Sequence, residues 1–282
     1  MAYAPKLGGL AGAKFPLQFA TENVTGISLG TTPVIQLSND GAGTIVSHGS
    51  GFFWRHKSSI VLVTARHVLS GREPFEDALI SPNGYIPNQI RVFPTISGDG
   101  VSWIRAITHM DLYDNDRPVW IEDPEFAELR TDIAVLPFGA DSSLQVRCIN
   151  DEPDLEKELF TRIGFECSIV GYPFHDMTGL MTPIWRRATI ASEPYLPVDN
   201  KPMFLLDATT SPGFSGSPVF RVHIGPLPVP QPDGSIQVYI EKMVSVSFVG
   251  VYAGRLQHKH IGGEVPFVFY GNRLARILSN PI

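Results

Sequence analysis

Three short motifs hold residue types that together could carry out nucleophilic catalysis. Ser215 lies in the glycine-rich run SPGFSGSPVF, His67 closes the β-branched run IVLVTARH, and Asp132 leads the apolar run in TDIAVLP. A serine hydroxyl is a weak nucleophile until a base takes its proton, and a histidine base needs a buried carboxylate to fix its tautomer. Taken alone, the histidine could end a strand, the aspartate could cap a turn and the serine could lie in an ordinary turn. The order His67, Asp132, Ser215 matches one known order of a catalytic triad, so the three motifs together predict a triad.

The glycines around Ser215 indicate where the negative charge of a reacting carbonyl would be stabilised. Glycine at position 213 reaches backbone dihedrals that a β-carbon would block, so the local amides can turn inward. The backbone amides of Gly213 and Ser215 are therefore the predicted donors of an oxyanion hole.

The elements that must position these residues are predominantly short strands. Acid-rich residues 111–130 are expected to form an exposed loop, residues 151–159 a short helix, and residues 270–280 a terminal helix with apolar residues at helical spacing. Strands at this spacing with almost no helix favour antiparallel barrels. The expected strands are 32–38, a hairpin over 43–69 whose second strand runs into His67, 89–96, 101–110, 166–173, 183–192, 203–209, 217–224, 236–253 and 265–271.

Six segments resemble the trypsin-like serine peptidases, and they occur in the order of that family. The likeness is closer to the short bacterial branch that includes the HtrA-type protease domain than to secreted digestive enzymes, although we expect no PDZ domain. It implies an all-β fold of two antiparallel six-stranded β-barrels (chymotrypsin-like) with a short C-terminal helix. It also implies His67 as general base, Asp132 as its orienter and Ser215 as nucleophile, in the cleft between the barrels. The segments are GSGFFW (49–54), VTARHVL (63–69), TDIAVLP (131–137), VGYP (170–173), GFSGSPVF (213–220) and VGVYAG (249–254).

The resemblance also implies how the chain is divided. Residues 1–282 would form a single peptidase domain. Its parts would be an N-terminal extension (1–30), a first barrel (about 31–145), an inter-barrel connection (about 146–164), and a second barrel with the terminal helix (about 165–282).

The same resemblance implies a pocket for the side chain that precedes the cleaved bond. Thr209, six residues before the nucleophile, would lie at its base, and neither its charge nor its size favours lysine or arginine. Val251, Tyr252, Ala253 and Gly254 would line one wall, on a strand that pairs with the substrate backbone. Tyr252 could narrow the pocket or point outward. We expect a small or medium apolar side chain in this pocket.

Three departures from the family pattern bear on regulation. Phe214 stands where digestive relatives have the aspartate that captures a new amino terminus, so that activation switch cannot operate. The enzyme would be competent as synthesised, or regulated by a partner that orders the oxyanion loop. Arg66 stands where a small residue is usual, and we expect it to point to solvent. Ser217 replaces a glycine, which is a mild change.

Composition excludes several other classes of function. A chain of 282 residues with 43% apolar content can bury a substantial core. The net charge of −6 argues against a nucleic-acid binder, and no apolar run reaches the ~20 residues that span a membrane. The histidines are scattered, and His258-x-His260 is most simply a surface loop. We expect no cofactor and no catalytic metal.

The chain contains two cysteines, Cys148 and Cys167. Secreted relatives usually carry several disulfides, so this count favours a reducing compartment. The two could pair, but buried thiols are the preferred interpretation. The amino terminus lacks the apolar core of a signal peptide, although a leader could have been removed. We therefore expect a cytoplasmic, bacterial protein.

These observations support a serine endopeptidase that acts on protein or peptide substrates, with a possible activating or regulatory protein partner. Two alternatives stay open. One is a catalytically silent module of the same fold that binds peptides. The other is an enzyme held latent until a partner activates it.

Overall fold

The structure of this chain is a computed structural model, and it describes most but not all residues. Most of the expected N-terminal extension and the His258–His260 loop lie outside the described residues. Within the extension, helix α1 (Gly26–Gly30) is described, and its Ile27 and Leu29 are buried against the body. The described residues are 24–38, 44–100, 103–139, 144–153, 155–156, 159–173, 182–231, 233–239, 244–257 and 264–280.

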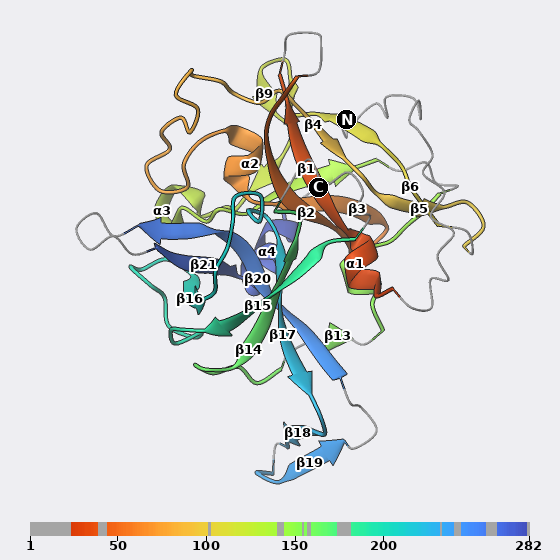
Figure 1. Cartoon of the computed structure of the whole chain (residues 1–282), viewed down its shortest axis with the longest axis vertical. Helices are drawn as coiled ribbons and strands as arrows, with labels where there is room; N and C mark the ends of the chain where they lie inside the picture. Colours follow the sequence, from red (N-terminus) through yellow and green to blue (C-terminus); the bar gives the residue numbers. More distant parts are fainter. Residues whose placement is uncertain are drawn as a thin grey trace.

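The first half of the chain folds into a curled seven-stranded antiparallel sheet and a smaller three-stranded sheet (Figure 1). The large sheet has the order β10-β11-β3-β2-β1-β4-β7, and the small one has the order β12-β5-β6. A separate two-stranded hairpin, β8–β9, lies in the loop before β10. The strands are β1 (Thr31–Leu37), β2 (Ile45–His56), β3 (Ser59–Thr64), β4 (Gln89–Val92), β5 (Thr95–Ser97), β6 (Ile104–Arg105), β7 (Thr108–Asp111), β8 (Tyr113–Asp114), β9 (Arg117–Pro118), β10 (Ile121–Glu122), β11 (Ala134–Phe138) and β12 (Gln145–Val146).

The second half forms a closed six-stranded barrel with the order β20-β17-β14-β15-β16-β21, which β21 closes by pairing with β20. Strand β13 adds to it in parallel, next to Val246 and Ser247 of β20. The strands are β13 (Leu155–Glu156), β14 (Glu166–Gly171), β15 (Ile184–Ile190), β16 (Met203–Asp207), β17 (Pro218–Ile224), β18 (Leu227–Pro230), β19 (Ile236–Tyr239), β20 (Val244–Gln257) and β21 (Glu264–Tyr270).

The predicted all-β fold is confirmed, with a difference between its two halves. The second barrel is closed, whereas the large sheet of the first half is curled and open. The predicted terminal helix is α4 (Gly271–Leu278). Its Leu274 and Ile277 are buried in one apolar cluster with Phe52 of the first half and Phe269 of the second. The helix therefore joins the two halves at their shared core.

Two predictions of local structure were wrong. The strand before His67 ends at Thr64, and His67 lies in the short helix α2 (Arg66–Ser70), which ends at Gly71 with φ of 66°. The expected helix at residues 151–159 is replaced, where described, by the end of a 3₁₀ turn η2 (Ile149–Asp151) and by β13. Pairing with β20 supplies backbone partners there that a short acidic helix would lack.

The loop expected to be exposed at residues 111–130 is partly buried. It contains β8, β9, β10 and a short helix, α3 (Phe126–Leu129), and the side chains of Trp120 and Asp123 are buried. Where the chain is described, no helix is long and apolar enough to cross a bilayer.

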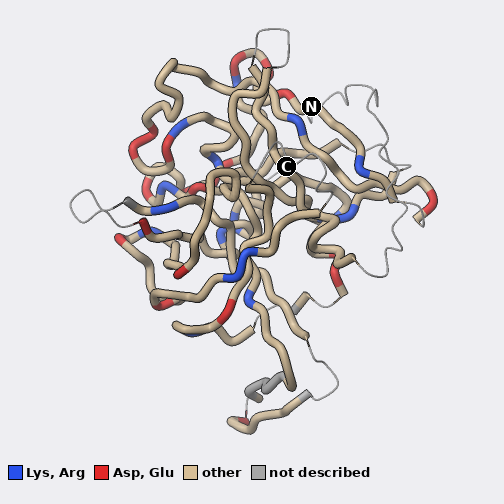
Figure 2. The backbone as a smooth tube through the Cα atoms, viewed as in Figure 1, with Lys and Arg blue, Asp and Glu red and all other residues tan. Residues whose placement is uncertain are grey.

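Beyond the barrel, β17 and β20 continue into an arm that ends in the hairpin of β18 and β19 (Figure 1). Ile224 and Ile236 on this arm are 72% and 66% exposed. Few charged residues lie along the described part of the arm (Figure 2). The arm lies away from the residues considered below.

Candidate active site

Strand pairing in the first half brings His67 and Asp132 together. The end of β3 pairs with the start of β11, Thr64 opposite Ala134, and the two residues lie just beyond this pair. The Nδ1 atom of His67 lies 2.6 Å from Oδ2 of Asp132, and the His67 backbone amide donates to Oδ1 at 2.8 Å. Asp132 is fully buried. One carboxylate therefore holds both the ring and the backbone of His67, which places the proton on Nδ1 and leaves Nε2 as the basic atom.

Ser215 lies in a tight turn between β16 and β17, on the second half. Gly213 and Gly216 have φ of 97° and 87°, values that glycine adopts without strain. A β-carbon on Gly216 would lie 2.1 Å from the carbonyl oxygen of Ser50 and 2.2 Å from Oγ1 of Thr64. Glycine at 216 is therefore required for the turn to touch the first half of the chain.

The hydroxyl of Ser215 donates to the carbonyl oxygen of Ala253 at 3.4 Å. No hydrogen bond joins it to His67, both residues being among those described. Hydrogen bonds between a nucleophile and its base are often long or unformed without substrate. The predicted nucleophile is thus beside strand β20, and rotation about its χ1 torsion would redirect the hydroxyl.

The amides of Gly213 and Ser215, the predicted oxyanion donors, are unused. Among the described residues, none accepts a hydrogen bond from either amide. Phe214 between them is fully buried and packs edge-on against Tyr252, with ring centroids 6.4 Å apart. Its burial explains why an apolar residue suits this position in place of an aspartate.

The residues expected to line a specificity pocket differ in exposure. Thr209 is exposed, whereas its neighbour Thr210 is buried. The Oγ1 atom of Thr210 lies 2.8 Å from the hydroxyl of Tyr252, which is 2% exposed. Tyr252 therefore points inward, and burial raises the pKa of its hydroxyl. The place of Thr209 at the base of the pocket stays a prediction.

The rest of the expected wall lies on β20 beside Ser215. Val251 and Ala253 are buried, and Gly254 has φ of 153° next to a bulge opposite Phe267. The Tyr252 amide donates to Ser217 O at 2.9 Å, which ties this strand to the turn of residues 212–217, called the nucleophile turn after the predicted role of Ser215. That this strand binds substrate stays a prediction.

Arg66 does not point to solvent. It is 7% exposed, and it forms ion pairs of 2.9 Å with Glu122 and with Asp77. Its guanidinium also lies 4.1 Å from the ring centroid of Phe126. Carboxylates of opposite charge therefore compensate its burial. Figure 2 shows acidic and basic residues interspersed around α2 and α3, where this cluster lies.

A second ion pair, which the sequence did not reveal, anchors the loop that leads to Asp132. Arg273 of α4 donates to both carboxylate oxygens of Asp123, which is fully buried. It also donates to Glu125 at 3.0 Å. Burial raises the pKa of Asp123, but the hydrogen bonds from Arg273 and from the Glu125 amide outweigh it and leave that pKa below its usual range.

Cys148 and Cys167 are free and buried, as expected. Burial raises the pKa of each thiol to about 12. Both are therefore unreactive thiols at neutral pH. Among the described residues, no three His, Cys, Asp or Glu side chains gather as a metal site.

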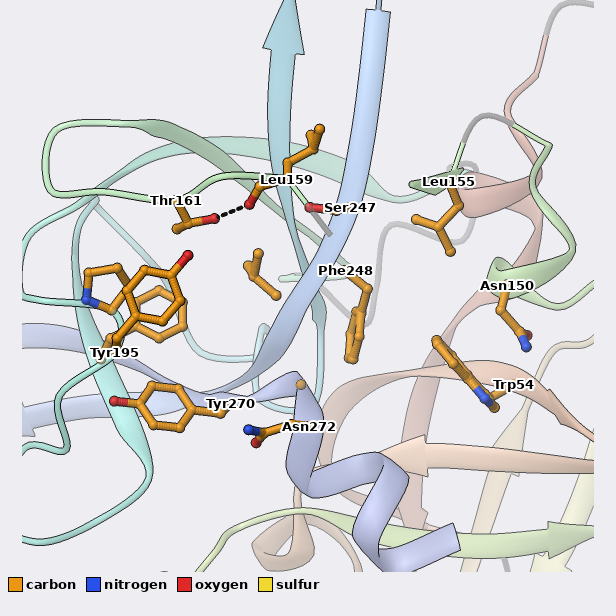
Figure 3. Close-up of a pocket in the computed structure, with 14 residues that line it drawn as sticks. Trp54, Asn150, Leu155, Leu159, Thr161, Tyr195, Ser247, Phe248, Tyr270 and Asn272 are labelled. Atoms are coloured by element: carbon orange, nitrogen blue, oxygen red, sulfur yellow. Dashed lines mark hydrogen bonds between the residues drawn. The ribbon is translucent and has the colours of Figure 1, made fainter. Parts of the chain in front are cut away.

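A cavity of about 730 Å³ lies apart from these groups (Figure 3). Tyr195 and Tyr270 lie on one side of Phe248, and Trp54 and Asn150 lie on the other. None of the predicted triad residues lines it. The cavity is therefore a feature of the junction between the two halves.

The chain was compared with known families and structures. A family model for the trypsin-like peptidase domain matches residues 49–225, more than half of the chain. A comparison with curated proteins finds no match.

Three solved structures are similar in fold. The HtrA-type protease AlgW, solved with a tripeptide, is 15% identical over 89% of this chain and 60% of its own, with a TM-score of 0.48. The Rv3671c protease from M. tuberculosis, in an active form, is 16% identical, and the match covers 90% of this chain and 81% of its own, with a TM-score of 0.42. Deg5 is 13% identical, and the match covers 88% of this chain and 87% of its own, with a TM-score of 0.49. The chain thus spans less than two thirds of the AlgW chain.

Proposed function

Because this chain belongs to the trypsin-like peptidase domain family, we propose that it is a serine endopeptidase. Its nucleophile is Ser215, its general base is His67, and Asp132 orients the base. Its substrates are proteins or peptides, as membership of a peptidase family suggests.

The observation that carries this proposal is the double contact between Asp132 and His67. A fully buried carboxylate that accepts from both the ring, at 2.6 Å, and the backbone amide, at 2.8 Å, fixes one tautomer. An ordinary capping aspartate would need only the backbone contact. The basic Nε2 atom is thereby kept for a proton on the substrate side.

The mechanism follows from these roles. The Ser215 oxygen attacks the peptide carbonyl carbon while its proton moves to Nε2 of His67. The tetrahedral oxyanion accepts hydrogen bonds from the amides of Gly213 and Ser215. The C–N bond then breaks as His67 protonates the leaving amine. Water attacks the acyl-enzyme by the same steps, giving the carboxylic acid and restoring the serine.

A preference for a small or medium apolar side chain before the cut is part of the proposal. Thr209, at the position that the family resemblance gives to the base of this pocket, is exposed and uncharged, so no carboxylate there would favour lysine or arginine. Profiling with a peptide library measures this preference. Efficient cleavage after phenylalanine or arginine would overturn it.

A peptide-binding module without activity is the second candidate. The observation in its favour is the Ser215 hydroxyl, which contacts Ala253 rather than His67. Such a module would bind peptides along β20 and never form an acyl-enzyme.

We also propose a reducing compartment, the cytoplasm, because both thiols are free. Fractionation of cells that express the chain tests this proposal. Recovery only in an oxidising compartment would overturn it.

Labelling with a fluorophosphonate separates the candidate functions, because the probe reacts only with an activated serine. We expect the purified wild type to label, and Ser215→Ala and His67→Ala to lose labelling by several orders of magnitude. A folded wild type that does not label, alone or with cell extract, would favour the binding module.

A further inference from the structure

Ser50 of β2 is a fully buried residue that contacts the nucleophile turn from the other half of the chain. Its amide donates to the carbonyl oxygen of Ser215 at 2.7 Å, and its hydroxyl donates to that of Gly213 at 2.7 Å. The hydroxyl also accepts from the amide of Tyr172 at 2.8 Å, and the Ser50 carbonyl accepts from Thr64 at 2.6 Å. Every polar group of Ser50 therefore has a partner, and two of the four contacts hold the turn.

These contacts fix the orientation of successive peptide groups. The carbonyls of Gly213 and Ser215 are bonded to Ser50, and that of Phe214 accepts from the amide of Ser217 at 2.9 Å. A peptide group is planar, so a carbonyl held in place fixes the amide on its other side. The Phe214 carbonyl thus sets the direction of the Ser215 amide. The Gly213 carbonyl shares a peptide plane with the Phe214 amide, so the Ser50 hydroxyl fixes the peptide group that lies between the two proposed oxyanion donors.

The turn and Ser50 are closely packed. A β-carbon on Gly49 would lie 3.0 Å from the Ser215 carbonyl oxygen, and one on Gly171 of β14 would lie 2.7 Å from Oγ of Ser50. Neither glycine position has room for a larger residue, so the turn meets β2 through direct backbone contact. Close packing of this kind holds one arrangement rather than a range.

We propose that Ser50 is a positioning residue that sets the oxyanion hole from within the chain, so that no partner is needed to order this loop. The inference rests on the proposed function and makes it more specific. Of the two regulatory alternatives, this inference favours an enzyme that is competent as synthesised, and it disfavours an enzyme that stays latent until a partner binds.

The hydroxyl of Ser50 matters because the residue that it holds, Gly213, is a glycine. The backbone at a glycine can rotate at little steric cost, because both signs of φ are open to it. Without the hydroxyl, the buried Gly213 carbonyl loses its donor, and turning toward another donor would relieve this loss. That rotation would carry backbone dipoles away from the oxyanion. Loss of one oxyanion donor typically slows turnover about 10²–10³-fold, so a misplaced donor should slow it about 10–100-fold.

Ser245 of β20 offers a matched control. It is as buried as Ser50, and among the described residues its hydroxyl has no hydrogen-bond partner. It pairs with His223 of β17 rather than with the turn, so Ser245→Ala removes a buried hydroxyl without removing a contact to the turn. We expect it to leave turnover unchanged.

The experiment compares wild type, Ser50→Ala and Ser245→Ala as full chains. It measures the second-order rate of fluorophosphonate labelling, kcat and KM on one peptide, and the melting temperature. We expect Ser50→Ala to slow labelling and lower kcat about 10–100-fold, with KM changed by less than about twofold. A purely structural role would instead change KM and the melting temperature together.

Several outcomes would overturn the inference. Labelling of Ser50→Ala at the wild-type rate, or an equal loss in Ser245→Ala, would do so while leaving the proposed function intact. A wild type that labels only after a partner is added would also overturn it and keep the proposed function. A wild type that never labels would overturn both.

A second variant covers the case in which Ser50→Ala does not fold. Ser50→Cys keeps a side chain of similar shape but offers a much weaker donor. A folded Ser50→Cys that labels slowly supports the inference, and one that labels at the wild-type rate overturns it.

Discussion

The two halves of the candidate active site are held in place by different forces. Around His67 and Asp132 the supports are charged. Arg66 pairs with Glu122 and Asp77, and the buried Asp123 pairs with Arg273 of the terminal helix. These supports surround the loop and the helix that carry Asp132 and His67.

Around Ser215 the supports are neutral. Hydrogen bonds from Ser50 and the Ser217 amide hold three successive carbonyls of the turn. Gly216 packs directly against the backbone of β2. The stability of the region around His67 and Asp132 should therefore depend on pH and salt. The stability of the turn around Ser215 should instead depend on the volume of side chains placed where its backbone contacts β2.

The largest effect is expected from Gly216→Ala. The new β-carbon would lie 2.1 Å from a backbone oxygen, and φ at this residue is 87°. Strain and clash together should lower the free energy of unfolding by about 3–5 kcal/mol and abolish labelling. Urea unfolding followed by tryptophan fluorescence measures the loss.

Gly164→Ala is the control for backbone strain alone. Gly164 has φ of 81°, but its added β-carbon would have nothing within 4 Å. We expect a loss of about 1 kcal/mol, with labelling unchanged. Equal losses in the two variants would mean that contact with β2 contributes little.

The fold could be predicted from the sequence because its signals are local. Each of His67, Asp132 and Ser215 adjoins an apolar strand, and pairing of β3 with β11 then forces the first two together. The nucleophile turn followed from its glycines, both of which have positive φ.

The supports of the site could not be predicted, because they are contacts between distant residues. Asp123 and Arg273 are 150 residues apart, and neither stands out in the sequence. Arg66 was expected in solvent because the side chains that enclose it come from two other segments of the chain, Asp77 from one and Glu122 and Phe126 from the other. Which of Thr209 and Thr210 faces inward depends on the turn geometry. Ser50 belongs to a motif that the sequence singled out, but its role is visible only across the contact between the two halves.

An intermediate loss of stability is expected from Asp123→Asn, which tests the ion pairs that support His67 and Asp132. Removing one partner of a buried ion pair usually costs about 3 kcal/mol, and the amide keeps part of the hydrogen bonding, so we expect about 2 kcal/mol at pH 7. Glu125→Gln is the control, because Glu125 also contacts Arg273 but is 34% exposed. It should cost less than about 1 kcal/mol.

The difference in stability between wild type and Asp123→Asn should shrink as the pH falls. The pKa of Asp123 in the folded state lies below its usual value. Its contribution is therefore complete above the unfolded-state pKa of about 3.9 and is lost as the pH falls through the folded-state pKa. Wild type and Asp123→Asn should converge in stability below about pH 4. A constant difference from pH 7 to pH 3 would show that the carboxylate charge is not what anchors the loop.

The smallest effect is expected from Arg66→Lys, which keeps the charge but loses the planar group. Lysine cannot reach Glu122 and Asp77 together while lying flat on Phe126, so we expect a loss of about 1 kcal/mol. Arg187→Lys is the control, since the Arg187 side chain is 79% exposed and should change nothing measurable. Because Asp77 and Glu122 are partly exposed, the loss should shrink when unfolding is measured at high salt.

The rate defect of Ser50→Ala should not change with salt, because every contact it removes is neutral. A salt-dependent defect in Ser50→Ala would mean that the two halves of the site are not held by different forces.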